Sequence, residues 1–386
     1  MVKFLLYLPY SEFIDSYEQK ALGAIPIGFV QAGFDTSLIV GIMKSNKFRK
    51  NNIRIYETGN LDERYIPENH SAGMSILPRL LNFFNFSEYR KVLKIIKKEK
   101  PDIMMAYNNS TLTWLIIWRY QLYCKFHKIQ TKFILKLDND GTDLKNMEGM
   151  RKIALKSYYK LLSRIFDDII TETSCGYQVF SKFPGVKTKL KIVPNTVFDD
   201  FLINNYRKEW DKIIINVSRI TPVKGIDKLI KSFGQIAGCY PDWNLLIIGP
   251  INDKEYFTSL MKLVNSYDLE KRIIFTGEKN REQLIEIYNH ASIYCLFSEH
   301  ESFAISRLEA IAMGLYVITT PAGCADDIVK YGVHIMKENT PECGSKYMEE
   351  GIISIESGTF LGNSNTIPSY RDIAREIADT AENNNV

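Results

Sequence analysis

The segment "SIYCLFSEHESFAISRLEAIAMGLYVITT", residues 292–320, decides the fold of this chain. It begins with an apolar, β-rich run at 292–297, which is typical of a buried strand. A helical pattern follows at 303–313 and stops at Gly314, before a second β-rich run at 315–320. A strand, a helix and a strand in this order predict a parallel sheet with a helix packed on one face.

The same alternation extends outward from this segment through both halves of the chain. The predicted strands lie at residues 3–8, 36–40, 102–107, 132–137, 168–173, 191–193, 213–218, 244–249, 272–277, 292–297 and 315–320. The predicted helices lie near residues 18–32, 75–99, 111–127, 148–164, 174–182, 224–238, 254–267, 281–290, 303–313 and 370–381. We therefore expect an α/β protein made of doubly wound sheets.

Turn-forming and polar residues cluster at 194–205 and mark the expected domain break. The predicted organisation is an N-terminal domain at 1–198, a second domain at 199–368 and a C-terminal segment at 369–386. A chain of 386 residues favours two domains over one. We expect a cleft between the domains, and a C-terminal helix that packs back on the first.

Composition places the chain among ordinary globular proteins, with 45% hydrophobic and 24% charged residues. The longest apolar run, 112–118, is far shorter than the ~20 residues that a membrane-spanning helix needs. The N-terminus has no pattern of a signal peptide. Six scattered cysteines without a C-x-x-C pair argue against a zinc site and against a disulfide framework. We expect a cytoplasmic protein with reduced thiols.

Charge is distributed unevenly along the chain. Residues 1–198 carry 30 Lys and Arg against 18 Asp and Glu, whereas residues 199–386 carry 19 against 27. One interpretation is two solvated surfaces of different sign, and the other is that the first domain faces an anionic partner. Basic and aromatic residues alternate at 83–100, 113–128 and 151–164, without a nucleic-acid-binding motif. We therefore expect peripheral attachment to an anionic membrane surface, and no nucleic acid.

Two loops of the second domain carry residues suited to an anionic ligand. The loop "SRITPVKG", residues 218–225, places Arg219 and Lys224 at the start of a helix, where a phosphate or diphosphate could bind. By themselves these residues are more simply interpreted as two surface cations in a loop. The segment "FTGEKNREQL", residues 275–284, contains Gly277, which allows close approach of a backbone.

Two carboxylates flank the start of the helix in the opening segment. Glu301 falls in the loop before the helical pattern, and Glu309 about two turns into it. The backbone N–H groups of residues 302–305 and the helix dipole form an anion site between these carboxylates. A ligand with both a phosphate and hydroxyl groups fits this arrangement, because carboxylates accept hydrogen bonds from hydroxyls. Sugar nucleotides have these groups.

The E-x7-E spacing of Glu301 and Glu309, with Arg219 and Lys224 upstream, resembles the retaining glycosyltransferases of family 4, which have the GT-B fold. The resemblance extends over residues 213–332, and "KIVPNTV" at 191–197 matches the region between the two domains. It implies two Rossmann-like domains and a C-terminal crossover helix. It also implies that Arg219 and Lys224 bind the donor diphosphate, Glu301 the donor sugar and Glu309 the ribose. The remaining residues implied to bind the donor are Gly277, Glu278, Ser302, Phe303, Ala304 and Ile305.

The implied activity is transfer of a sugar from a nucleotide sugar to a glycan or a lipid-linked acceptor, in lipopolysaccharide, capsule or exopolysaccharide biosynthesis. The resemblance implies neither a metal nor another cofactor, because the cations and the helix start would neutralise the diphosphate. The alternatives are a nucleotide-sugar-binding accessory subunit with weakened catalysis, and a GT-B phosphorylase or epimerase.

The first domain departs from the family pattern at two positions. A Gly-Gly pair is replaced by "PYSEFIDSYEQKALG", residues 9–23, which makes Tyr10, Ser11 and Glu18 candidate acceptor contacts. Asp138 stands where many members have a histidine, and its carboxylate could orient the acceptor hydroxyl or accept its proton.

Overall fold

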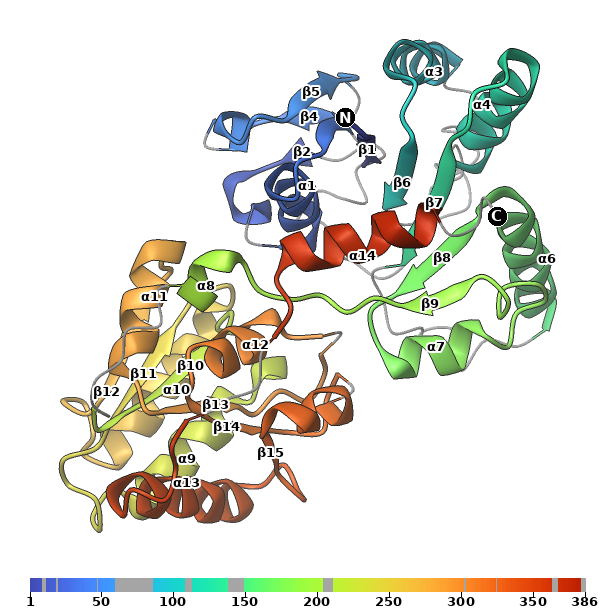
Figure 1. Ribbon diagram of the computed structural model, residues 1–386. Helices are drawn as coiled ribbons and strands as arrows, with labels where there is room; N and C mark the ends of the chain where they lie inside the picture. Colours follow the sequence, from blue (N-terminus) through green and yellow to red (C-terminus); the bar gives the residue numbers. More distant parts are fainter. Residues whose placement is uncertain are drawn as a thin grey trace. The chain divides into compact units, whose positions relative to one another are not determined.

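The computed structural model describes residues 1–8, 12–18, 20–46, 48–59, 86–107, 113–137, 149–203, 211–301, 303–323, 325–362 and 367–382. The chain divides into two compact units (Figure 1). The first consists of Met1–Asn195 with Ser369–Val386, and the second of Thr196–Pro368. Each unit contains a parallel sheet with helices on both faces, so the predicted doubly wound α/β architecture is confirmed.

The sheet of the first unit has seven strands in the order β5-β3-β1-β6-β7-β8-β9. All its pairs are parallel. The strands are β1 (Lys3–Tyr7), β3 (Asp35–Val40), β5 (Arg54–Glu57), β6 (Ile103–Tyr107), β7 (Lys132–Leu137), β8 (Asp168–Thr171) and β9 (Leu190–Ile192). The strands β2 (Glu12–Phe13) and β4 (Ile42–Met43) form a separate small sheet.

Helices cover both faces of this first sheet. One face packs against α3 (Phe86–Glu99), α4 (Thr113–His127), α6 (Gly149–Ile165) and α7 (Ser174–Phe180). The other face packs against α1 (Ala21–Gln31), where Phe4 of β1 stacks on Phe29. The C-terminal helix α14 (Tyr370–Glu382) packs on α1. The helix α14 begins there because Ser369 and Asp372 cap it reciprocally.

The sheet of the second unit has six strands in the order β12-β11-β10-β13-β14-β15. They are β10 (Ile213–Val217), β11 (Asn244–Ile248), β12 (Ile273–Gly277), β13 (Ile293–Leu296), β14 (Tyr316–Thr319) and β15 (His334–Ile335). One face packs against α9 (Ile226–Ile236), α10 (Lys254–Ser266) and α13 (Pro341–Glu356). The remaining helices of this unit are α8 (Asp199–Ile203), α11 (Arg281–His290) and α12 (Ile305–Ala312).

The structure differs from the sequence predictions in several elements, among them three helices. The 16-residue helix α13 was not predicted, although Thr340 caps it and Pro341 occupies its first turn. The helix α12 begins at Ile305 instead of residue 303, because Ala304 has a left-handed backbone with φ 58°. The helix predicted at 75–99 is described from Phe86 onward, and residues 60–85 lie outside the described part.

Among the described cysteines, Cys124, Cys239, Cys295 and Cys343 are free thiols.

Candidate functional site

The strand order of the second unit brings two predicted ligand-binding loops together. The strands β10 and β13 are neighbours, although β11 and β12 lie between them in the chain. From β10 the chain continues to β11 on one side, and it later returns to β13 on the other side. The loops that follow β10 and β13 therefore lie next to each other at the same edge of the sheet. Ligands of open α/β sheets bind at such switch points.

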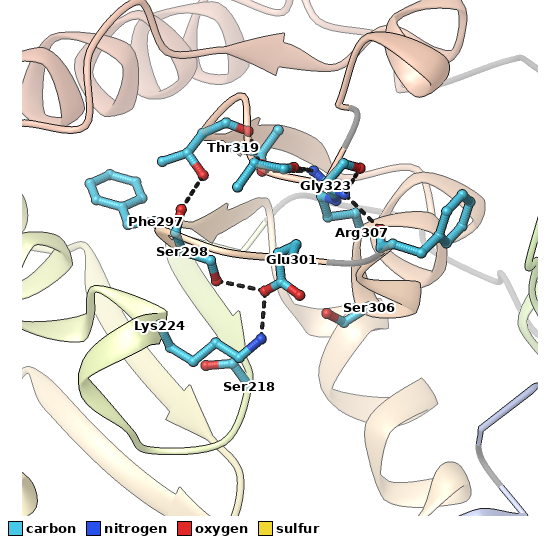
Figure 2. Close-up of polar contacts among 12 residues, drawn as sticks. Ser218, Lys224, Phe297, Ser298, Glu301, Ser306, Arg307, Thr319 and Gly323 are labelled. Atoms are coloured by element: carbon cyan, nitrogen blue, oxygen red, sulfur yellow. Dashed lines mark hydrogen bonds and ion pairs between the residues drawn. The ribbon is translucent and has the colours of Figure 1, made fainter. Parts of the chain in front are cut away.

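Lys224 and Glu301 meet at this edge (Figure 2). The ammonium Nζ of Lys224 lies 2.5 Å from Oε1 of Glu301, and the hydroxyl of Ser298 donates to the same oxygen at 2.6 Å. Only 13% of the Lys224 side chain and 8% of the Glu301 side chain are exposed. A buried carboxylate without such partners would be costly, so this ion pair fixes both groups at the mouth of the site.

Close backbone contacts hold the two loops against each other. Gly225, at φ 61°, is the turn between Lys224 and α9, and a Cβ there would lie 2.2 Å from the carbonyl oxygen of Phe297. The N–H of Glu299 donates to the carbonyl of Val223 at 2.9 Å. Glycine is therefore required at position 225, because any side chain would push the loops apart.

The loop after β14 forms the third side of the site. Gly323, at φ 65°, lies against Glu301 so closely that a Cβ would be 2.5 Å from the Glu301 Cβ. The hydroxyl of Thr320 donates to the carbonyl of Ser298 at 2.6 Å. Glu301 is therefore held by contacts from three successive loops at one edge of the sheet.

Arg307 ties two of these loops together from inside the fold (Figure 2). Its side chain is 1% exposed and donates to the carbonyls of Phe303, Ala322 and Gly323 at 2.6, 2.9 and 3.1 Å. Burial lowers the pKa of the guanidinium from its ordinary value. The sequence analysis assigned no role to Arg307, and the structure makes it a positioning residue for the loops after β13 and β14.

The backbone at the start of α12 is strained. Ala304 has φ 58° and ψ 77°, which residues other than glycine rarely adopt. Its carbonyl accepts from the N–H of Arg307, while no hydrogen-bond partner of the Ile305 and Ser306 N–H groups is found among the described residues. The first-turn donors of α12 are thus available to a ligand.

Glu309 lies about one turn into α12 instead of the predicted two turns, because the helix begins at Ile305. It accepts a hydrogen bond from the hydroxyl of Tyr288 on α11, at 3.1 Å. Withdrawal from solvent raises the pKa of Glu309 to about 7, while the Tyr288 hydrogen bond and the charge of Arg281 act in the opposite direction. Glu309 therefore changes its charge near neutral pH. Tyr288 was not predicted, and only its place on the neighbouring helix could have indicated it.

The other predicted donor residues of the second unit lie around these loops. Arg219 is exposed just after β10, without an ion-pair or hydrogen-bond partner in the described part of the chain. Gly277 ends β12 with φ 73° and Glu278 is exposed beside it. Phe303 and Ala304 precede α12 and Ile305 begins it, while Ser302 lies outside the described residues.

The candidate acceptor residues belong to the first unit. Glu18 is buried, 6% exposed, and its Cα packs against Gly23. Tyr10, Ser11 and Asp138 lie outside the described residues. Within the described ranges, no group of three His, Cys, Asp or Glu side chains could hold a metal ion. No helix in these ranges is long and apolar enough to cross a bilayer.

Comparison with known proteins shows what this chain resembles. The family model described as "Glycosyl transferases group 1" matches residues 199–356. The chain has the GT-B fold, as the sequence resemblance implied. Together these matches support a glycosyltransferase of the GT-B type.

Individual relatives agree with this class. An uncharacterized glycosyltransferase of Methanocaldococcus jannaschii is 29% identical over 257 residues, covering 63% of this chain and 61% of the relative. The mannosylfructose-phosphate synthase of Agrobacterium fabrum is 31% identical over 192 residues, covering 46% of this chain and 42% of the relative. Each of these two matches therefore covers less than two thirds of this chain and less than two thirds of the relative. The fold resembles that of Anabaena HepE in complex with UDP and glucose, with a TM-score of 0.65 and 15% identity over 99% of this chain and 100% of HepE.

Proposed function

We propose that this protein is a retaining glycosyltransferase of family 4 that transfers a sugar from a nucleotide sugar to a hydroxyl of a glycan or a lipid-linked acceptor in cell-surface polysaccharide biosynthesis. The observation that carries the proposal is the buried Lys224–Glu301 ion pair at the switch point, beside the open first turn of α12. Cations, backbone donors and carboxylates in one place suit a ligand that has both a diphosphate and hydroxyl groups.

The diphosphate would bind to the positive groups of this site. Arg219 is exposed and free to grip two oxygens, and Lys224 would turn from Glu301 toward a phosphate. The N–H groups of Ile305 and Ser306 would donate to phosphate oxygens at the positive end of α12. These charges matter most when the sugar–phosphate bond breaks, because the leaving diphosphate then gains negative charge. We propose that they replace a metal ion in this role.

The carboxylates would bind the hydroxyl groups of the donor. Glu301 would accept from the sugar as Lys224 turns away, and Glu309 would accept from the ribose. Glu301 is engaged by Lys224 and Ser298, and no carboxylate is placed as a covalent nucleophile among the described residues of this site. Retention of configuration would then follow a front-face route, in which the departing phosphate assists attack from its own side.

A panel of nucleotide sugars tests this proposal. The protein is incubated with each donor and excess EDTA, and slow donor hydrolysis is followed by release of the nucleoside diphosphate. We expect turnover of one donor, and the anomeric configuration of the product reports retention. Lys224→Ala and Glu301→Ala should each lower turnover by about 100-fold or more, in line with the loss of one preorganised electrostatic group. Lys271→Ala, at an exposed position of the same unit, is the matched control.

Four results would change the assignment. Full activity of either site variant would refute the role of the ion pair. Donor binding without turnover, even with acceptors present, would indicate an accessory subunit. Turnover that depends on inorganic phosphate would indicate a phosphorylase, and loss of turnover with EDTA would refute the metal-independent mechanism.

A further inference from the structure

The helix α4 of the first unit exposes an apolar face. Trp118, Leu122 and Phe126, here called the α4 ridge, are 43%, 44% and 84% exposed. A spacing of four residues places them on one side of the helix. The opposite side is buried in the sheet core through Ile116, Ile117, Tyr120 and Cys124. The helix α4 is therefore apolar on both sides.

A helix on the surface of a globular protein normally turns polar residues to water. The neighbouring helix α3 follows this rule, because its exposed positions include Lys91, Lys94 and Lys98. The helix α4 departs from it with two large aromatic rings and a leucine, and contiguous exposed apolar surface of this kind marks an interaction site. Figure 1 shows α4 beside α3 and α6, within the first unit.

Positive charges surround the α4 ridge. Arg119, Lys125 and Lys128 are exposed beside it, and α6 adds the exposed Lys156, Lys160 and Arg164. The two helices touch where the Gln121 amide donates to the carbonyl of Ile165. Neither α4 nor α6 contains an Asp or Glu, and within the described ranges none of these six cations has an ion-pair partner.

We infer that the α4 ridge and the six surrounding cations form the surface by which this protein attaches to an anionic phospholipid bilayer. Tryptophan and phenylalanine insert at the level of the lipid head groups, and lysine and arginine are attracted to anionic lipids. Aromatic anchors beside lysine and arginine, on two helices that contain no Asp or Glu, match this chemistry. A second copy of the chain fits less well, because a two-fold contact through α4 would bring Arg119, Lys125 and Lys128 against their own copies without an opposing carboxylate.

This inference rests on the proposed function in one respect, because a lipid-linked acceptor would be located at the bilayer surface. The surface belongs to the first unit, whereas the residues proposed to bind the donor diphosphate belong to the second. Attachment and donor turnover can therefore be measured independently.

Vesicle binding by the full chain provides the test. Co-sedimentation is measured with phosphatidylcholine vesicles and with vesicles of phosphatidylcholine and phosphatidylglycerol at 3:1, each at 50 and 500 mM NaCl. We expect binding only to the anionic vesicles, and release at high salt. Trp118→Ser/Phe126→Ser should weaken this binding at least tenfold, while the control Leu361→Ser, at a side chain 90% exposed, should leave it unchanged.

A second pair of variants tests the charges. Lys125→Glu/Lys128→Glu should weaken binding by at least about 25-fold, since each cation near an anionic surface contributes roughly fivefold. Lys254→Glu/Lys271→Glu, at exposed positions of the second unit, carries the same change in net charge and should have little effect. Thermal unfolding confirms that each variant is folded.

The inference is refuted if the wild-type protein does not bind anionic vesicles at 50 mM NaCl, or if both pairs of α4 variants bind as tightly as the wild type. A dimer in light scattering that Trp118→Ser/Phe126→Ser converts to a monomer, with vesicle binding intact, would assign the ridge to a second copy. Donor turnover without vesicle binding would refute the proposed membrane-binding surface and leave the proposed function intact. Vesicle binding without donor turnover would refute the proposed function and leave the membrane-binding surface intact.

Discussion

Replacing Glu309 by glutamine is expected to stabilise the second unit at neutral and alkaline pH. Burial raises the pKa of Glu309 to about 7 in the folded protein, against 4.5 for an ordinary glutamate. The folded state therefore favours the protonated form. The stability that this protonated form contributes is complete below pH 4.5, and is lost as the pH rises toward and through 7. Glutamine keeps the acceptor oxygen for the Tyr288 hydroxyl and carries no charge at any pH.

The magnitude follows from the difference between the two pKa values. At about 1.36 kcal/mol per pH unit, Glu309 lowers the free energy of unfolding, relative to a side chain that stays uncharged, by about 3 kcal/mol at pH 8. At pH 5 the difference is about 1 kcal/mol, because only the unfolded chain is ionised there. For a domain of this size, 1 kcal/mol shifts the melting temperature by about 2–4 °C. Glu309→Gln should therefore melt about 6–12 °C higher than the wild type at pH 8, and only slightly higher at pH 5.

Thermal unfolding of both proteins from pH 5 to pH 8, followed by circular dichroism, measures this difference. Glu270→Gln replaces an exposed carboxylate of the same unit and should follow the wild type at every pH. A constant offset between Glu309→Gln and the wild type across this range would refute the reasoning. So would a variant that is less stable than the wild type at pH 8, since Glu309 would then be stabilised in its charged form.

Three further substitutions probe the loops of the site. Gly323→Ala would place a Cβ 2.5 Å from the Cβ of Glu301. We therefore expect a loss of about 2 kcal/mol in the free energy of unfolding, measured in urea, and at least tenfold lower donor turnover. The control Gly358→Ala, at φ 71° in open space, should cost only about 1 kcal/mol and keep donor turnover. Arg307→Met should destabilise the unit by about 3 kcal/mol in the same assay, because buried carbonyls lose their donors, and unchanged stability would contradict the positioning role. Lys224→Ala should lower stability by about 3 kcal/mol, because it leaves the Glu301 carboxylate buried and unpaired, and Lys224→Met should not restore it.

Much of the fold could be predicted from the sequence because parallel strands buried on both faces are continuous apolar runs. The strand predicted at 132–137 matches β7, and the helix predicted at 281–290 matches α11. The helix α13 was missed although Thr340 and Pro341 mark its start, because its two glycines and mixed pattern weaken the helical periodicity. The strand β5 was missed because it is short, polar and at the edge of its sheet.

The candidate site was predictable only as a set of loops. The rule for switch points places Lys224 and Glu301 at one edge of the sheet, although 77 residues separate them. The direct contact between the two groups, and the hydrogen bond from Ser298, could not be predicted because such contacts depend on loop geometry. The left-handed backbone conformation of Ala304 could not be predicted either, because alanine favours helices and the surrounding packing holds this conformation.

The Lys224–Glu301 contact has a consequence for how the proposed site would distinguish its substrate from its product. A diphosphate that draws Lys224 away leaves the Glu301 carboxylate buried with only the Ser298 hydroxyl as a donor. A ligand that also presents sugar hydroxyls supplies the missing donors, whereas a nucleoside diphosphate without its sugar does not. The intact donor would then be held more firmly than the spent nucleotide, and the return of Lys224 to Glu301 would help to expel the product after each turnover.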